Sequence, residues 1–465
     1  MSSQTKLTFH GGRFMATLPM LIFIIWAISI CVAGAPDEAG LILGMIIGLV
    51  LTMFLVKGKW FDYCEEIFTG MADRIGVVAI VCWLFAGMFA QILKVGGLVE
   101  GLVWLGTFLN VSGSFFPAIT FLLAAVFATA VGTGYGTTVA FCTLMYPTGI
   151  IMGAPPVLMF AAILSGAAFG DNLAPVSDTT IVSAATQETD VPGVVRSRFK
   201  YAITAAIPAL FLFLLLGFLM KTTNAPTLQS GVIANIGPKG LLLLIPFAFV
   251  IFLALKGYHI ITALSIGMIL SILCYPLFNL ASLGTVITID TQNAQVTGAL
   301  VDGITGYVKM AVLILLIMAA NHIIHIGGAM DAIKDFLFQF IKNSVRRAEL
   351  VIWAFVSSLN VFITINTAAE IAAAPFVKEI GKKFKLHPYR RANFLDAITS
   401  ALGYIFPWSG GVLIGFATIS HLAKTMPGLT IVKPTDVWPF VFHGWLLVLV
   451  MLLAAITGKG RRFEK

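Results

Sequence analysis

Long apolar runs, separated by short polar stretches, recur along the whole chain. The first apolar run covers about 20 residues from Ala16 to Ala35, and another follows at once. That length lets an α-helix cross the hydrocarbon core of a bilayer, whereas a transmembrane barrel would show short alternating segments. The pattern predicts an all-α polytopic membrane protein with about ten crossings.

The order of these runs predicts four segments and an internal duplication. Gly96-Gly97 matches Gly327-Gly328, and the Pro-x-Ser triplet 175–177 matches the triplet 407–409 at nearly the same offset. Two similar offsets so far apart indicate a repeat. We expect two N-terminal spans in 1–58, a first repeat in 59–220, connecting spans in 221–290 and a second repeat in 291–465.

Basic residues in the loops predict that the two repeats are inverted relative to each other. Segment 98–115, after the first glycine pair, has no Lys or Arg, but its counterpart after the second pair is basic. The segments before the two pairs show the opposite bias, because the one before the first pair is basic and the one before the second pair is not. Because cytoplasmic loops are enriched in Lys and Arg, matching segments face opposite sides. This is typical of inverted-topology repeats, and it places both termini in the cytoplasm of a bacterial cell with an inner membrane.

Composition agrees with a lipid-embedded protein. The chain is 59% hydrophobic and only 11% charged, against about 25% charged in ordinary soluble domains. We attribute the net charge of +8 to cytoplasmic loops, so the expected partner is membrane lipid and not nucleic acid. Whether the chain forms a homodimer is left open.

One polar stretch interrupts an apolar run between Val157 and Thr186. Gly170 and Pro175 predict a break in the helix. Carbonyls freed by such a break, together with carboxylate and hydroxyl oxygens, suit a hard cation such as Na⁺. A carboxylate in this setting also binds a proton, so one site can hold either ion. The candidate cation and proton ligands are Asp171, Asn172, Ser177, Asp178, Thr179 and Thr180, with Asp171 and Asp178 as the Na⁺ carboxylates. Asp178 alone fits a helix N-cap equally well.

Two further stretches read as the tips of re-entrant hairpins. "GTGYGTT" (132–138) contains too much glycine for a stable helix, and Thr133 is a candidate ligand there; the alternative is a close-packed helix crossing. Its counterpart is "TINTAAE" (364–370), in which Asn366 and Thr367 are candidate ligands. Glu370 is either a second proton carrier or a capping residue.

The second copy of the broken helix is "GYIFPWSGG" (403–411), and it has no aspartate. Ser409 is its candidate ligand. Asp396, shortly before this stretch, is either a buried carrier or a partner of the nearby Arg390 or Arg391. The two halves are therefore not chemically equivalent.

The motif "FGDNLAPVSDTT" (169–180) resembles the signature of the NhaC-type sodium/proton antiporters, in the wider ion transporter superfamily, and the "PWSGG" region resembles their second-half motif. The resemblance implies Na⁺/H⁺ exchange at a broken-helix cation site in 171–180. Relatives also include organic-acid exchangers and amino-acid transporters. This chain has Pro-Trp-Ser-Gly at 407–410 where the family pattern is Pro-Trp-Asn-Thr, which leaves room for an organic solute.

These observations favour a secondary active transporter that works by alternating access, with competing Na⁺ and H⁺ at a midplane carboxylate site. The alternative is Na⁺- or H⁺-coupled transport of a small amino acid or carboxylic acid. A membrane enzyme or a channel is disfavoured, because no nucleophile–base motif is present and inverted repeats with broken helices suit alternating access. Na⁺ is expected as the transported or coupling ion, with no cofactor.

Overall fold

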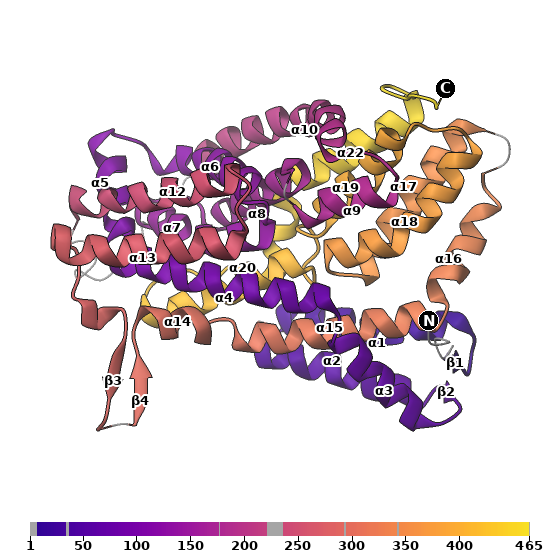
Figure 1. The fold of residues 1–465 in the computed structure, drawn as a ribbon, viewed down its shortest axis with the longest axis horizontal. Coiled ribbons are helices and arrows are strands. Elements are labelled where there is room, and N and C mark those ends of the chain that lie inside the picture. Colours follow the sequence, from indigo (N-terminus) through magenta and orange to yellow (C-terminus); the bar gives the residue numbers. More distant parts are fainter. Residues whose placement is uncertain are drawn as a thin grey trace.

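The structure is a computed structural model, and it describes residues 7–33, 37–175, 177–220, 236–292, 294–341 and 344–464. Nearly all of its regular structure is α-helical (Figure 1). The predicted connecting segment includes 221–235, which lie outside the described residues. The all-α fold class is confirmed, and the division into four segments remains a prediction.

The first half runs through ten long or broken helices. They are α1 (Leu18–Val32), α2 (Glu38–Met53), α3 (Trp60–Met71), α4 (Arg74–Val95), α5 (Leu98–Phe108), α6 (Phe116–Val131), α7 (Gly134–Ile151), α8 (Pro156–Leu173), α9 (Asp178–Thr186) and α10 (Val191–Leu219). The 3₁₀ turns η1 (Arg13–Thr17) and η2 (Gly113–Phe115) precede α1 and α6. Strands β1 (Thr8–Phe9) and β2 (Val56–Lys57) form a short antiparallel pair.

The remainder of the chain continues the same architecture. Its helices are α12 (Leu244–Leu255), α13 (Ile260–Phe278), α14 (Ala299–Thr305), α15 (Val308–Ile326), α16 (Ala329–Phe338), α17 (Val345–Phe362), α18 (Asn366–Lys383), α19 (Pro388–Leu402), α20 (Gly410–Thr425), α21 (Pro434–Val437) and α22 (Phe442–Thr457). The 3₁₀ turns are η3 (Pro238–Leu243), η4 (Leu283–Thr285) and η5 (Trp438–Phe440). A hairpin of β3 (Thr288–Asp290) and β4 (Gln295–Thr297) projects from one end (Figure 1).

Seven of the described helical segments are long and apolar enough to cross a membrane, and an eighth is the bent pair Pro434–Phe440 and Phe442–Thr457. The number is below the expected ten because several helices are short. The 16 residues of α2 rise about 24 Å, less than the ~30 Å of a bilayer core. The chain is nonetheless an integral membrane protein with several spans.

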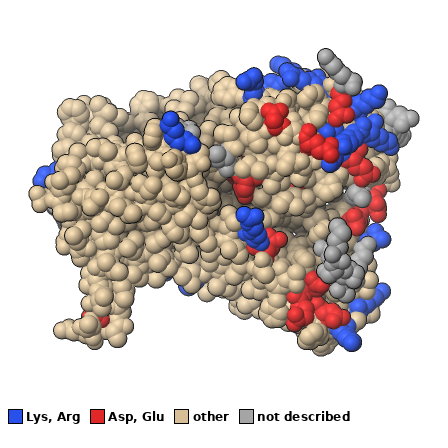
Figure 2. Space-filling view, viewed as in Figure 1, with Lys and Arg blue, Asp and Glu red and all other residues tan. Residues whose placement is uncertain are grey.

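The surface is typical of a lipid-facing protein. Large apolar side chains such as Phe211 (62% exposed) and Leu277 (71% exposed) point outward, while many polar side chains are buried inside. In the view of Figure 2, Lys, Arg, Asp and Glu gather at one end, where Figure 1 places both labelled chain ends, and the remaining face is almost free of charge. Charged residues at one end and an apolar surface along the length are typical of helices that cross a bilayer.

The two glycine pairs occupy equivalent places in the helix order. Each follows a long helix, and its second glycine begins a short helix with a left-handed backbone: φ is 90° at Gly97 and 74° at Gly328. A residue without a side chain adopts this conformation without strain. The helices before the two pairs lie antiparallel, because Gly76 of α4 packs on Met318 of α15 whereas Gly87 packs against Gly303 of α14 (Figure 1).

Candidate functional site

The predicted break divides α8 from α9. The helix α8 ends at Leu173, Ala174 is extended (φ −70°, ψ 123°), and Pro175 follows. A residue before proline is pushed out of the helical region, which explains the end of the helix here. Helix α9 begins at Asp178 after the extended Ser177. The break thus separates two aspartates, with Asp171 in the last turn of α8 and Asp178 in the first turn of α9.

Asp171 is buried and accepts hydrogen bonds from three separate elements. One carboxylate oxygen accepts from the hydroxyl of Ser177 at 2.8 Å. The other accepts from the side-chain amide of Asn366 at 2.6 Å and from the hydroxyl of Tyr404 at 3.0 Å. The two longer-range donors come from the second half of the chain, so that half completes the surroundings of a carboxylate in the first half.

Asp178 differs from Asp171 in being exposed. One of its oxygens accepts from the backbone amide of Thr179 at 3.0 Å, which resembles a capping interaction. The other accepts from the hydroxyl of Thr367 at 2.6 Å. The N-cap of α9 is Ser177, so Asp178 is the first helical residue and not the expected cap. Its contact with Thr367 bridges α9 to the first turn of α18.

Hydroxyl groups connect this pair of aspartates with the second half. The hydroxyls of Ser177 and Thr179 lie 3.0 Å apart, and that of Ser400 lies 3.5 Å from Thr179. All three side chains are fully buried. The structure thus collects most of the predicted ligands of the first break, together with Asn366 and Thr367, in one place.

The second hairpin tip and the second break are joined by backbone hydrogen bonds. The amide of Gly410, at the start of α20, donates to the carbonyl of Thr364 at 3.0 Å. Tyr404, from the turn between α19 and α20, packs its ring 5.5 Å from the ring of Tyr135 in α7. A Cβ at Gly134 would lie 1.9 Å from the Tyr404 hydroxyl, so only glycine lets the start of α7 approach this closely.

Asp396 pairs with neither of the two arginines that lie near it in sequence. Its carboxylate is paired with Arg198 of α10, and both side chains are fully buried. It also accepts from the hydroxyl of Ser400 at 2.5 Å and from that of Ser183 at 3.4 Å. The expected partner Arg390 pairs with Glu349 at 2.9 Å instead, and Arg391 pairs with Glu464 at 2.9 Å.

Several predicted residues have other surroundings. The hydroxyl of Thr180 accepts from Arg198 at 3.5 Å. The side chain of Asn172 and the carboxyl of Glu370 are buried, and their polar atoms have no hydrogen-bond partner among the described residues. Glu370 lies within electrostatic range of Asp396 and Arg198. The hydroxyl of Ser409 donates to the carbonyl of Phe406 at 2.8 Å, within its own turn.

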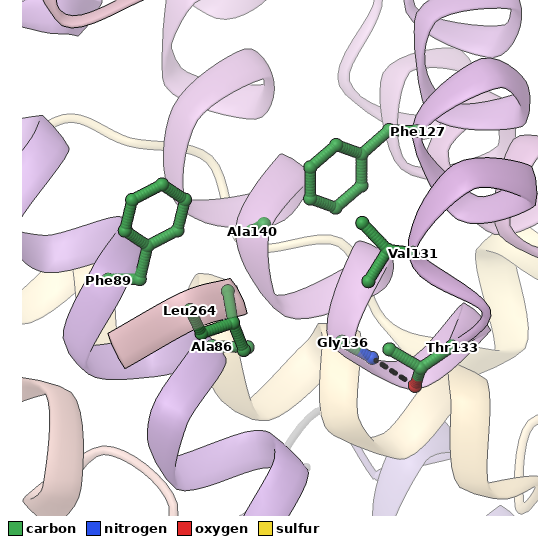
Figure 3. A pocket seen from close by; sticks show the side chains of 8 residues that line it. All are labelled: Ala86, Phe89, Phe127, Val131, Thr133, Gly136, Ala140 and Leu264. Carbon is green, nitrogen blue, oxygen red and sulfur yellow. Dashed lines mark hydrogen bonds between the residues drawn. The ribbon is translucent and has the colours of Figure 1, made fainter. Parts of the chain in front are cut away.

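Thr133 lies at the predicted hairpin tip, but its hydroxyl is engaged locally. It accepts from the amide of Gly136 at 3.2 Å and so caps the start of α7. Figure 3 shows this bond at the edge of a small pocket whose other lining side chains are apolar. The lining residues are Ala86, Phe89, Phe127, Val131, Thr133, Gly136, Ala140 and Leu264. The pocket itself offers few oxygens for a cation.

Two residues at the centre of the site, Arg198 and Tyr404, were not among the predicted ligands. Arg198 stands between Arg196 and Lys200 in a stretch that reads as a basic cytoplasmic loop. A signal was present nonetheless, since positions 194, 201, 202 and 205 lie at helical spacing from 198 and are all apolar in the sequence. The structure buries this whole face, Arg198 included. Tyr404 carried no such signal, because its role depends on a contact with α8.

A model of the Na⁺/H⁺ antiporter family matches residues 6–218 and 184–445. The chain belongs to this family. This confirms the resemblance seen in "FGDNLAPVSDTT" and the expectation of a membrane transport protein and not an enzyme. The Na⁺/H⁺ antiporter NhaC of Alkalihalophilus pseudofirmus is 24% identical over 90% of this chain and 90% of its own length.

The names of other relatives give different substrates. The arginine/ornithine antiporter ArcD of Halobacterium salinarum is 26% identical over 55% of this chain and 53% of its own length. The malate-2H⁺/Na⁺-lactate antiporter of Bacillus subtilis is 29% identical over 41% of this chain and 40% of its own. The match thus spans about half the length of these two relatives or less. The crystal structure of the Alcanivorax borkumensis YdaH transporter is a distant neighbour, with 13% identity and a TM-score of 0.39 over 95% of this chain and 98% of its own.

Proposed function

We propose that this protein is a secondary antiporter that exchanges Na⁺ for H⁺ at the break between α8 and α9. The observation that carries the proposal is the pair of carboxylates on the two sides of that break, each bonded to side chains of the second half. Family membership supports the same function. Carboxylate and hydroxyl oxygens around interrupted helices are the ligands that Na⁺ prefers in such transporters.

Na⁺ is the cargo here, and the chain supplies its ligands. Asp171 and Asp178 provide negative charge, and Ser177 and Thr179 provide neighbouring hydroxyl oxygens. The side-chain amide of Asn172 is buried and has no hydrogen-bond partner in the described part of the chain, so its oxygen is free to turn toward a cation. A buried polar group without a partner is costly, which favours a ligand that satisfies it during the transport cycle.

Competition between Na⁺ and H⁺ follows from the surroundings of Asp171. Its three donors stabilise the carboxylate when no cation is bound. Either ion neutralises the single negative charge of this carboxylate, so a bound proton removes the attraction for Na⁺ and a bound Na⁺ disfavours the proton. Exchange of one ion for the other then links their gradients without further chemistry.

Alternating access and inverted repeats belong to the same proposal. The antiparallel course of α4 and α14–α15, and the similar helix order after each glycine pair, support an inverted relation of the two halves. We place the charged end of the molecule, with both chain ends, on the cytoplasmic side of the inner membrane (Figure 2). The site then lies between the halves, where relative motion opens it to either side.

Coupled transport of a small organic acid or amino acid is the second candidate. Its supporting observation is the second break, where Ser409 and Gly410 replace larger polar residues and Ser409 bonds only within its turn. Names of two relatives point the same way, since they are antiporters of arginine and ornithine and of malate and lactate.

One assay separates the two candidates. The purified protein in proteoliposomes receives an inward Na⁺ gradient while a dye reports the internal pH. Alkalinisation of the lumen without any added solute supports Na⁺/H⁺ antiport. Na⁺ movement that appears only with an added amino acid or carboxylic acid contradicts it and favours the second candidate.

A further inference from the structure

Arg198 ties together three helices that build the proposed cation site. Its guanidinium donates to the backbone carbonyl of Asn172 in α8 at 2.7 Å and to the hydroxyl of Ser183 in α9 at 3.1 Å. It is also paired with Asp396 of α19. The side chain is fully buried, although it projects from the second turn of α10, a helix apolar enough to span the membrane.

The bond to Asn172 places a positive charge at the interrupted end of α8. The last carbonyls of a helix lack intrahelical partners and form the negative end of its dipole. A buried guanidinium there satisfies the carbonyl and compensates the dipole. Asn172 is the residue next to Asp171, so this arrangement fixes the backbone from which the cation-binding carboxylate projects.

Asp396 is surrounded by donors in this arrangement. It bonds to Arg198, to Ser400 at 2.5 Å and to Ser183 at 3.4 Å. A buried carboxylate that is paired with an arginine and bonded to two hydroxyls has no need of a cation from solution. The negative charge of Asp396 therefore neutralises that of Arg198. Asp171 differs from Asp396 because its three donors are all neutral.

We infer that Arg198 and Asp396 form a charge-neutral positioning pair: Arg198 holds the α8 end of the cation site, and Asp396 cancels its charge without carrying Na⁺ or H⁺. This inference rests on the proposed Na⁺/H⁺ exchange. It removes Asp396 from the candidate carriers, although a buried acid in a membrane helix is by default a functional candidate. The pair acts on transport through Asn172 and the field at Asp171.

The test measures the KM for Na⁺ and the maximal exchange rate in proteoliposomes for three variants. Asp396→Asn leaves a guanidinium that cannot lose its proton, so an uncancelled positive charge repels Na⁺ from the neighbouring site. We expect its KM for Na⁺ to rise about tenfold or more. Arg198→Gln combined with Asp396→Asn removes both charges, and we expect KM to return to within about threefold of the wild type, with a lower maximal rate.

Arg198→Lys completes the set because it keeps the charge but lacks the planar fork of donors with which the guanidinium holds the three helices. We expect an almost unchanged KM and a reduced maximal rate. The matched control is Glu349→Gln, which breaks the other buried arginine–carboxylate pair of α19 (Arg390–Glu349, 2.9 Å) away from the cation site. It should lower thermal stability and leave the KM for Na⁺ unchanged.

Two results would overturn the inference. One is a double variant that folds, as judged by size-exclusion chromatography, and has no exchange while Arg198→Lys retains it, because the loss would then follow Asp396 and not the arginine. The other is an unchanged KM in Asp396→Asn. If the double variant aggregates, the exchanged pair Arg198→Asp with Asp396→Arg replaces it, and failure to recover exchange in that variant overturns the inference too. A wild type without Na⁺-driven proton movement contradicts the proposed function and this inference together.

Discussion

Replacing Asp171 by Asn separates the charge of the site from its shape. Asn has nearly the same volume as Asp, and its single carbonyl oxygen can keep the bonds from Asn366 and Tyr404. Its amino group then faces the hydroxyl of Ser177, which can rotate from donor to acceptor. All three contacts therefore persist, and we expect the free energy of unfolding to change by no more than about 1 kcal/mol.

The loss of cation binding should be far larger than this change in stability. A unit charge within about 4 Å of Na⁺ contributes about 4 kcal/mol at an effective dielectric constant near 20. Each 1.4 kcal/mol corresponds to a factor of ten, so Asp171→Asn should weaken Na⁺ binding about a thousandfold. Exchange then disappears at any practical Na⁺ concentration, while the amount of folded protein stays the same.

Two measurements on the same preparation check this prediction. Dye-loaded proteoliposomes report exchange, and thermal unfolding in detergent with and without Na⁺ reports binding without turnover. Asp436→Asn, a change at an exposed carboxylate of α21, is the matched control and should behave as the wild type. Na⁺-driven proton movement in Asp171→Asn at more than about a tenth of the wild-type rate refutes the assignment of the charge to this residue.

Three further predictions concern packing and surface charge. Gly170→Ala should reduce the yield of folded protein, because the added Cβ would lie 2.1 Å from the Cβ of Ala128 and 2.5 Å from a backbone nitrogen of α6. The control is Gly237→Ala, where the added Cβ enters open space, and its yield should be normal. Glu349→Ala should lower the free energy of unfolding by about 3–5 kcal/mol, since it leaves the buried Arg390 and the partly buried Arg461 without their counter-charge. An unchanged melting temperature would contradict this. Two lysines of α18 form ion pairs with Glu188 and lower its pKa to about 2. Its carboxylate therefore stays charged at any pH above the usual Glu pKa, and the ion pairs are lost only as the pH falls through about 2. Glu188→Gln should therefore leave the pH profile of exchange between pH 5 and 9 unchanged; a shifted profile would show that this group titrates there.

The break in α8–α9 was predictable because its causes are local. Proline excludes helical backbone from the residue before it, and this requires no knowledge of the rest of the fold. The left-handed glycines at 97 and 328 are local in the same sense. Each of these features depends on the residue itself and its immediate neighbours in the sequence.

The hydrogen-bond partners of the two aspartates could not be predicted from neighbouring residues in the sequence. Asn366 and Tyr404 lie 195 and 233 positions from Asp171, and only the packing of α18 against α9 and of α19 against α8 brings them together. The buried position of Arg198 was not predicted for a different reason. Three basic residues at alternate positions suggest a solvated loop, but in a helix the middle one points away from the other two. Arg196 and Lys200 are exposed, and Arg198 is buried on the opposite face.

The two breaks satisfy their freed backbone groups in different ways, and this difference bears on how many cations the chain binds. In the second break, the amide of Gly411 donates to the carbonyl of Gly403 within the turn, and the amide of Gly410 donates to the carbonyl of Thr364 at the neighbouring hairpin tip, so backbone carbonyls satisfy both amides. In the first break, a carbonyl of α8 is satisfied by the guanidinium of Arg198, and two carboxylates remain beside it. The second half contributes the neutral donors Asn366, Thr367 and Tyr404 to those carboxylates. Because both carboxylates flank the first break and their long-range donors come from the second half, the fold favours one composite cation site over two equivalent ones.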